Sequence, residues 1–399
     1  MAAQVQGTCD PRFAKVKSLA QSYLDTGEEL GFSLCVNIDG TDVLDLWGGY
    51  ADATKTKPWE KDTITCAWSS TKLVAAVCLL VCIDRGLLDP NEKVAKYWPE
   101  FAANGKEGVE VRHLLSHATG LSGWQEDITM EEVCDLKKST DLLEQQAPWW
   151  EPGTKSGYHA FTMGHLIARL IEKVINLPID DFMRKEITGP LGADFQFGAQ
   201  EKDWDRVAEI VPPPVVTDLS KIPEPFKDPN SLTFRTFGRS PGLDARVANM
   251  EFWRKAVVPA GNGYTNARGL VRVLSTVSLS SPENPSSFFS PETMSKIFTT
   301  QQHGIDAVIV APVRFGLGFA LPSPGTMNEN LPDGRVGSWG GWGGSQGIVD
   351  ADRKITIAYV MNKMENAGMG QSEGRKKLGM GNYRQKDYLA AIYEALGVQ

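Results

Sequence analysis

Residues 68–83 read Trp-Ser-Ser-Thr-Lys-Leu-Val-Ala-Ala-Val-Cys-Leu-Leu-Val-Cys-Ile. Within them Ser69 and Lys72 are three positions apart, so on a helix both side chains share one face, about one turn from each other. The eleven residues after Lys72 are all apolar, and we expect core to surround this helix on nearly every side. Burial lowers the pKa of a lysine, and a neutral lysine can take the proton of a serine hydroxyl. The stretch therefore predicts an activated serine nucleophile at the start of a buried helix.

The Ser-x-x-Lys pattern alone is weak evidence. Such a spacing arises by chance about once or twice in a chain of this length. Here it occurs once, directly after a strand-like run at residues 63–68 and at the opening of the apolar segment. This position favours a functional interpretation, which depends on what the rest of the chain places around the pair.

Composition narrows the class of partner. The chain has 399 residues, 42% of them hydrophobic and 23% charged, which is typical of a globular protein with one large domain or two. The formal net charge is −8, with acidic and basic residues interspersed and no basic stripe. This argues against nucleic acid and anionic membranes as partners and favours a small-molecule substrate. The oligomeric state is left open.

The longest apolar run is also too short to cross a membrane, since a spanning helix needs about 20 residues. Residues 1–8 lack a basic region followed by an apolar one, so we expect no secretory signal and a cytoplasmic location. The six cysteines show no paired C-x-x-C spacing, so we expect reduced, mostly buried thiols and neither a disulfide framework nor a zinc ribbon. They are Cys9, Cys35, Cys66, Cys78, Cys82 and Cys134.

Strand signals lie near both ends of the chain and helical periodicity lies between them. Asp39-Gly40 tolerates positive φ and predicts a hairpin. The predicted strands are 32–38, 43–47, 313–321, 347–349 and 355–361; the predicted helices are 13–30, 111–116, 130–146, 162–175, 179–187 and 385–396. The expected fold class is α+β, an antiparallel sheet flanked by helices and built from both termini, with an inserted all-helical region.

We expect residues 1–399 to form a single catalytic unit made of two parts. The α/β part covers about 1–85 plus 260–399, and the helical part covers about 86–259. Ser69 would lie at their interface, where pockets commonly form. Residues 204–259 are rich in proline with little periodicity, so we expect a long ordered loop or lid there.

Two further stretches could complete a site. Tyr158 lies in a Pro/Gly-rich loop just ahead of a predicted helix, where a tyrosine is usually a packing residue with a surface hydroxyl. Residues 338–347 concentrate glycine just before two strands. Glycine lets backbone approach a ligand closely, and an edge strand can present an N–H to an oxyanion. The alternative for that stretch is a flexible glycine-rich loop.

Three of these features occur in an order typical of a known family. Ser69-x-x-Lys72, Tyr158 after residues 152–154, and Trp339-Gly340-Gly341 resemble the class C β-lactamase-like serine hydrolases, and most closely the family VIII carboxylesterases. Residues 111–121 and 189–193 resemble recurring segments of the same family. The resemblance runs from about residue 31 to the last predicted helix and implies the β-lactamase/transpeptidase-like fold.

The resemblance also implies roles. Ser69 would be the nucleophile, with Lys72 and Tyr158 sharing proton transfer as general base and acid. The backbone N–H groups of Ser69 and Trp342 would form the oxyanion hole. We further expect the buried Lys72 to hold the Tyr158 hydroxyl and to lower its pKa below the usual value of about 10, which would favour the phenolate.

The strand motif would also contribute Trp339, Gly340 and Gly341 to substrate binding. Where β-lactamases have Tyr-x-Asn and Lys-Thr-Gly, this chain has Tyr158-His159-Ala160 and Trp339-Gly340-Gly341. The missing amide and ammonium are groups that would hold a β-lactam, so an esterase fits better than a β-lactamase.

We therefore expect a serine carboxylesterase, without cofactor or metal, that cleaves small-molecule esters through an acyl-enzyme. Three alternatives stay open: an acyltransferase that resolves the same acyl-enzyme with an alcohol, a β-lactamase or D-amino peptidase, and a catalytically silent binding protein.

Other motifs are weaker. Residues 238–242 and 343–347 fit G-x-S-x-G, but Ser240 is followed by a proline without an N–H, and Ser345 is followed by a predicted strand. No histidine follows His303 to complete a triad after Ser345. His113 and His117 are four apart on a predicted helix but lack the glutamate of H-E-x-x-H, so we expect structural histidines there and not a zinc site.

Overall fold

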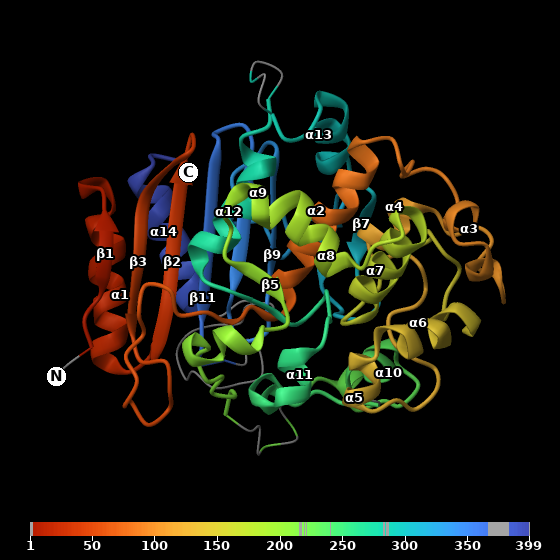
Figure 1. The fold of residues 1–399 in the computed structure, drawn as a ribbon, viewed down its shortest axis with the longest axis horizontal. Coiled ribbons are helices and arrows are strands. Elements are labelled where there is room, and N and C mark those ends of the chain that lie inside the picture. The colour runs from red at the N-terminus through yellow and green to blue at the C-terminus, as the bar shows by residue number, and fades with distance from the viewer. Residues whose placement is uncertain are drawn as a thin grey trace.

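The computed structural model describes residues 3–214, 218, 220, 222–239, 241–281, 284, 287–365 and 383–398. Its main sheet has six strands, and every neighbouring pair in it is antiparallel. In spatial order the strands are β1 (Gln6–Cys9), β3 (Thr41–Gly49), β2 (Gly31–Ile38), β11 (Ile355–Met361), β10 (Gln346–Asp350) and β9 (Val336–Gly340). Figure 1 shows the red N-terminal strands beside the blue C-terminal strands. The α+β sheet built from both ends of the chain is confirmed.

The predicted hairpin joins β2 and β3. Asp39 and Gly40 both have positive φ, 49° and 85°, the conformation that this tight turn requires. At the other end of the sheet β9 is the edge strand, and β10 begins directly after Ser345.

Helices cover both faces of this sheet. Ser33 on β2 accepts a hydrogen bond from the backbone N–H of Ala267, at the start of α12 (Ala267–Ser278). The neighbouring residue in β2 is Phe32, and its ring stacks on Tyr388 of α14 (Tyr383–Ala395). Consecutive residues of a strand point to opposite faces, so α12 and α14 lie on opposite sides, and α1 (Ala14–Thr26) packs beside α14.

The helix predicted from residues 68–83 is α2 (Thr71–Asp84), and it lies in the core as expected. Every residue from Thr71 to Ile83 is buried. It packs between α12 and α7 (Thr162–Ile175), so it joins the sheet to the helices on the other side of the molecule (Figure 1).

The remaining helices lie mostly between α2 and α12 in the chain. They are α3 (Val94–Tyr97), α4 (Val111–Leu115), α5 (Met130–Cys134), α6 (Leu136–Gln145), α8 (Ile179–Met183), α9 (Gly189–Leu191), α10 (Leu232–Phe237), α11 (Glu251–Lys255) and α13 (Pro291–Phe298). The prediction of one helix over residues 130–146 is wrong in one respect. This range contains two helices separated at Asp135, whose side chain accepts from the backbone N–H of Lys138 and caps the second.

Several strands do not match the sequence expectation. A second sheet has the strand order β4 (Thr65–Cys66), β6 (Gly263–Thr265) and β5 (Phe195–Phe197). The strand-like run at residues 63–68 contains β4, whereas β5 and β6 were not expected and are too short to show alternation. The strand predicted over 313–321 is shorter, β8 (Pro312–Phe315), and it pairs with β7 (Gln302–Ile305). The described residues of 204–259 are not one continuous loop, because α10 and α11 interrupt it.

Two further findings concern the described residues as a whole. None of their helices combines the length and apolarity that a membrane crossing requires. All six cysteines are free thiols, four of them buried.

Candidate active site

The nucleophile candidate lies on a short turn and not on the long helix itself. Trp68–Ser70 form a single 3₁₀ turn, and Lys72 lies in the first turn of α2 that follows. Trp68 has φ of 47°, a left-handed conformation that costs free energy for a bulky residue. Ser69 is partly exposed, whereas Trp68 and Ser70 on either side of it are buried. The turn therefore presents one hydroxyl from an otherwise buried segment.

Lys72 is 1% exposed, and its Nζ has three oxygen neighbours. It lies 3.0 Å from Ser69 Oγ, 2.6 Å from the carbonyl oxygen of Ala160 and 2.8 Å from that of Ala260. Burial holds the pKa of Lys72 well below its usual value of 10.5. The three oxygens match the three N–H groups of the ammonium form. In the neutral form, which burial favours, the two carbonyls can accept the two N–H groups and leave the lone pair for Ser69.

Backbone geometry that sequence reasoning missed supplies these two carbonyls. Ala160 lies two residues before the start of α7, in the Tyr158 loop. Ala260 lies in a turn organised by the buried Asn262, whose side chain accepts from Val258 N and donates to two backbone carbonyls. No sequence pattern indicates which backbone carbonyl will accept a hydrogen bond from a lysine. The asparagine between two glycines at residues 261–263 did indicate a turn.

Tyr158 donates from its hydroxyl to Ser69 Oγ at 2.7 Å, so Lys72 and Tyr158 converge on the same oxygen atom. The expected phenolate is wrong for this state. Burial raises the pKa of Tyr158 to about 12, and hydrogen bonding only partly opposes it. Lys72 Nζ lies over the Tyr158 ring, 4.9 Å from its centroid, while the tyrosine hydroxyl is directed to Ser69. Burial therefore favours the protonated form of Tyr158 and the neutral form of Lys72.

Asp306 is a second residue that sequence reasoning missed. It is fully buried, and its Oδ1 accepts from the backbone N–H of Tyr158 at 2.9 Å and from those of Val308 and Ile309. One more backbone bond, from Ala307 N to Ser156 O, joins the same two loops. A lone acidic residue inside an apolar run was the available signal. Asp306 fixes the loop that carries Tyr158.

The glycine-rich strand end lies against the nucleophile turn. A Cβ added to Gly341 would lie 2.4 Å from Ala67 O and 3.1 Å from Ser69 N, so only glycine permits this approach. A Cβ on Gly340 would meet the Gln346 side chain instead.

Aromatic rings pack near the contact between Gly341 and the nucleophile turn. The ring of Trp342 packs on that of Trp68 at 5.2 Å between centroids, and Trp339 is 5.2 Å from Tyr158. The predicted residues 339–342 are thus beside Ser69 and Tyr158.

Burial disfavours the charged form of the histidines near the site. The predicted helix ends at Leu115, and His117 lies beyond it with φ of 59°, so His113 and His117 do not share a helical face. Burial lowers the pKa of His159 to about 3 and that of His117 well below its usual value. Across the described ranges, no cluster of three His, Cys, Asp or Glu side chains is placed to hold a metal ion.

Of the two G-x-S-x-G serines, the structure describes only Ser345, which is more deeply buried than Ser69. Ser345 is 1% exposed and hydrogen-bonded to Ala67 O at 2.6 Å. Ser240 lies outside the described residues.

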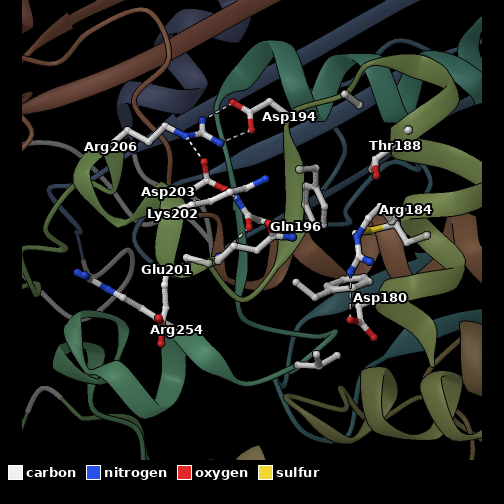
Figure 2. Close-up of a pocket in the computed structure, with 18 of the residues that line it drawn as sticks. Asp180, Arg184, Thr188, Asp194, Gln196, Glu201, Lys202, Asp203, Arg206 and Arg254 are labelled. Carbon is white, nitrogen blue, oxygen red and sulfur yellow. Dashed lines mark hydrogen bonds and ion pairs between the residues drawn. The ribbon is translucent and has the colours of Figure 1, made fainter.

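Two open cavities lie elsewhere on the described surface. One of about 710 Å³ is drawn in Figure 2, where Arg206 pairs with Asp194 and Asp203, and Arg184 pairs with Asp180. The other, of about 910 Å³, is lined by residues that include Trp149 and Arg235. Neither is lined by Ser69, Lys72 or Tyr158. The arginines named in the first cavity are already neutralised by carboxylates.

Comparison with known proteins identifies relatives along nearly the whole chain. Residues 16–378 match the model of the family described as Beta-lactamase, a range that includes Ser69, Lys72, Tyr158 and residues 339–342. The protein named Esterase/beta-lactamase LipL, from Mycobacterium tuberculosis, is 31% identical over 369 residues, which cover 90% of this chain and 83% of LipL.

Two further matches differ in extent. A solved structure described as a family VIII carboxylesterase matches with a TM-score of 0.84 at 31% identity, covering 98% of this chain and 100% of the other. The Penicillium citrinum protein named ML-236A carboxylate methylbutanoyltransferase mlcH is 27% identical over 173 residues, which cover 38% of this chain and 41% of that protein.

Proposed function

The chain belongs to the beta-lactamase family, and from this premise we propose that it is a serine carboxylesterase that cleaves small-molecule carboxylic esters through an acyl-enzyme on Ser69. The observation that carries the proposal is the convergence of Lys72 Nζ and Tyr158 Oη on Ser69 Oγ, at 3.0 and 2.7 Å. A relative named as an esterase and a structural neighbour described as a carboxylesterase support the ester substrate.

Acylation begins with Lys72 as general base. Its two N–H groups bond the carbonyls of Ala160 and Ala260, and its lone pair takes the Ser69 proton as Oγ attacks the ester carbonyl. The carbon–oxygen bond to the alcohol then breaks, and the protonated Tyr158 gives its proton to the departing alkoxide. The backbone N–H groups of Ser69 and Trp342 stabilise the oxyanion.

Deacylation reverses both transfers. The Tyr158 phenolate left by acylation takes a proton from the attacking water, for which a group of high intrinsic pKa is a strong base. The Lys72 ammonium returns its proton to Ser69 Oγ when the acid product leaves. Each group ends the cycle in its starting protonation state, and neither cofactor nor metal enters any step.

A pH profile tests the protonation states. Lys72 must be neutral to act, so kcat/KM should fall as pH decreases through its lowered pKa. Tyr158 must be protonated, and its pKa of about 12 predicts no descending limb below about pH 10. Buried His117 and His159 stay neutral and add no limb near neutrality.

The measurement is kcat/KM for an aryl acetate between about pH 5 and pH 10, the range over which an aryl ester can be assayed. A bell with its descending limb near pH 8 would contradict the assignment of Tyr158 as the acid.

Trp339 predicts the choice between esters and β-lactams. An indole stands where a lysine would pair with the lactam carboxylate, and such an ion pair is about twice as strong as a neutral hydrogen bond. Trp339 also places a buried apolar ring beside Tyr158, which favours uncharged substrates. We expect weak or absent turnover of nitrocefin relative to an aryl butyrate, compared as kcat/KM on one preparation.

Trp339→Lys is the matched variant for this comparison. We expect it to shift the ratio of the two specificity constants toward nitrocefin. Comparable values in the wild-type enzyme would overturn the ester preference. A variant that loses both activities alike would show that Trp339 serves the fold more than the choice of substrate.

Acyl transfer is the second candidate function. The relative named as a methylbutanoyltransferase favours it. Apolar rings near the site also favour it, since Trp342 packs on Trp68 and Trp339 packs on Tyr158, and exclusion of water protects an acyl-enzyme from hydrolysis. A panel of aryl esters with and without added alcohols separates the two functions. Free acid as the main product in the presence of alcohol supports the esterase, and a new ester as the main product supports the transferase.

A further inference from the structure

The hydroxyl of Ser345 connects two segments that are distant in sequence. It donates to the carbonyl of Ala67 at 2.6 Å, and the hydroxyl of Ser70 lies 2.9 Å from it. Ser345 has one O–H group, so Ser70 is the donor in the second bond. Ala67 and Ser70 flank Trp68 and Ser69 in the chain. Ser345 is thus hydrogen-bonded on both sides of the nucleophile candidate while its own side chain is 1% exposed.

Ser345 also closes the turn that follows β9. The backbone N–H of Gly341 donates to Ser345 O at 2.8 Å, and that of Gly344 donates to Gly341 O. This turn contains Trp342, whose N–H is assigned to the oxyanion hole above. Gly341 itself touches Ala67 O and Ser69 N so closely that a Cβ would not fit. One side chain therefore ties the two backbone segments that carry the two oxyanion donors.

The turn that carries Ser69 requires stabilising contacts of this kind. Trp68 has φ of 47°, and a strained backbone of this kind persists only where the surrounding contacts hold it in place. The Ser345 bond to Ala67 O holds the carbonyl immediately before the strained residue. The backbone N–H of Ser70 reaches the same carbonyl at 3.2 Å, a weaker contact by distance.

We propose that Ser345 is a positioning residue for the oxyanion hole, one that holds the Ser69 and Trp342 N–H groups at the spacing that a tetrahedral intermediate requires. This inference rests on the proposed function. It gives the serine of the 343–347 G-x-S-x-G motif a role without making it a nucleophile. Because the hydroxyl touches neither substrate nor reacting atoms, its removal should weaken stabilisation of the transition state and leave ground-state binding unchanged.

The test compares Ser345→Ala with the wild-type enzyme on an aryl butyrate. Loss of a whole oxyanion donor costs roughly 100- to 1000-fold in kcat, so loosening of the pair should cost about 10- to 100-fold with KM nearly unchanged. Affinity for an alkyl boronic acid, which forms a tetrahedral adduct with a serine, should fall by a similar factor. The acid limb of the pH profile, set by Lys72, should not move. A boronate affinity equal to wild type would overturn the proposal.

Two variants keep the result interpretable. Ser280→Ala is the matched control, since Ser280 is also a buried serine with two hydrogen bonds, to Thr276 O and from Phe289 N, away from the site. It should leave kcat and boronate affinity at wild-type values. Ser70→Ala removes only the second bond of Ser345 and should give a smaller loss of both quantities. If Ser345→Ala does not fold, Ser70→Ala takes its place in the test. Wild-type kcat and boronate affinity in Ser70→Ala would then overturn the proposal.

Failure of this inference differs from failure of the proposed function. If the wild-type enzyme hydrolyses no ester and Ser69 takes no label from a serine-directed phosphonate, the proposed function fails. If both succeed and Ser345→Ala retains full kcat and boronate affinity, only the role of Ser345 is wrong.

Discussion

Ser69→Ala should abolish ester turnover and all labelling by a serine-directed phosphonate. Without the hydroxyl no acyl-enzyme can form, and neither Lys72 nor Tyr158 has another oxygen to activate at the same place. The measurements are steady-state hydrolysis of an aryl acetate and intact mass after phosphonate treatment. The neighbouring side chains are unchanged in this variant, so its fold should be retained.

Serine-to-alanine changes in the two G-x-S-x-G motifs are the controls for the label. Ser240→Ala, and Ser345→Ala after long incubation, should both still take one phosphonate per chain. If either change removes the label while Ser69→Ala retains it, the assignment of the nucleophile is wrong.

Lys72→Met and Tyr158→Phe should each lower kcat/KM by at least about 100-fold, because each removes one end of a single proton-transfer unit centred on Ser69 Oγ. Their effects should not add, and the double variant should resemble the worse single variant. Methionine suits the buried position of Lys72, and phenylalanine keeps the ring that packs against Trp339.

The measurement is a double-mutant cycle on kcat/KM, with thermal unfolding to confirm that each variant folds. A double variant whose loss equals the product of the two single losses would show that Lys72 and Tyr158 act independently.

The elements of the site that are local in sequence could be predicted, and those made by distant backbone could not. Ser69 and Lys72 were found because their spacing and the apolar segment lie in one stretch. The two carbonyls that bond Lys72 come from residues 88 and 188 positions away, and a carbonyl has no sequence signature. The direction of the Tyr158 pKa was wrong for a related reason, since it depends on how completely that side chain is buried.

The fold shows the same division. Residues 355–361 are mostly β-branched, aromatic or apolar, and they form β11 with the predicted bounds. The three strands of the second sheet are only two or three residues long, and their pairing depends on the tertiary fold. The helix α12 was missed although a signal existed. Leu270, Leu274 and Val277 follow a helical spacing, and the Asn266 side chain accepts from Gly269 N as a helix cap.

Acylation of Ser69 by substrate can be detected by mass spectrometry of the trapped enzyme. The wild-type chain would be quenched in acid during turnover of an aryl butyrate, digested, and its peptides sequenced by mass. We expect a mass increase equal to one butyryl group on the peptide that contains Ser69, and none in Ser69→Ala. Butyryl on a different residue, or full turnover with no acylated peptide at any quench time, would contradict this expectation.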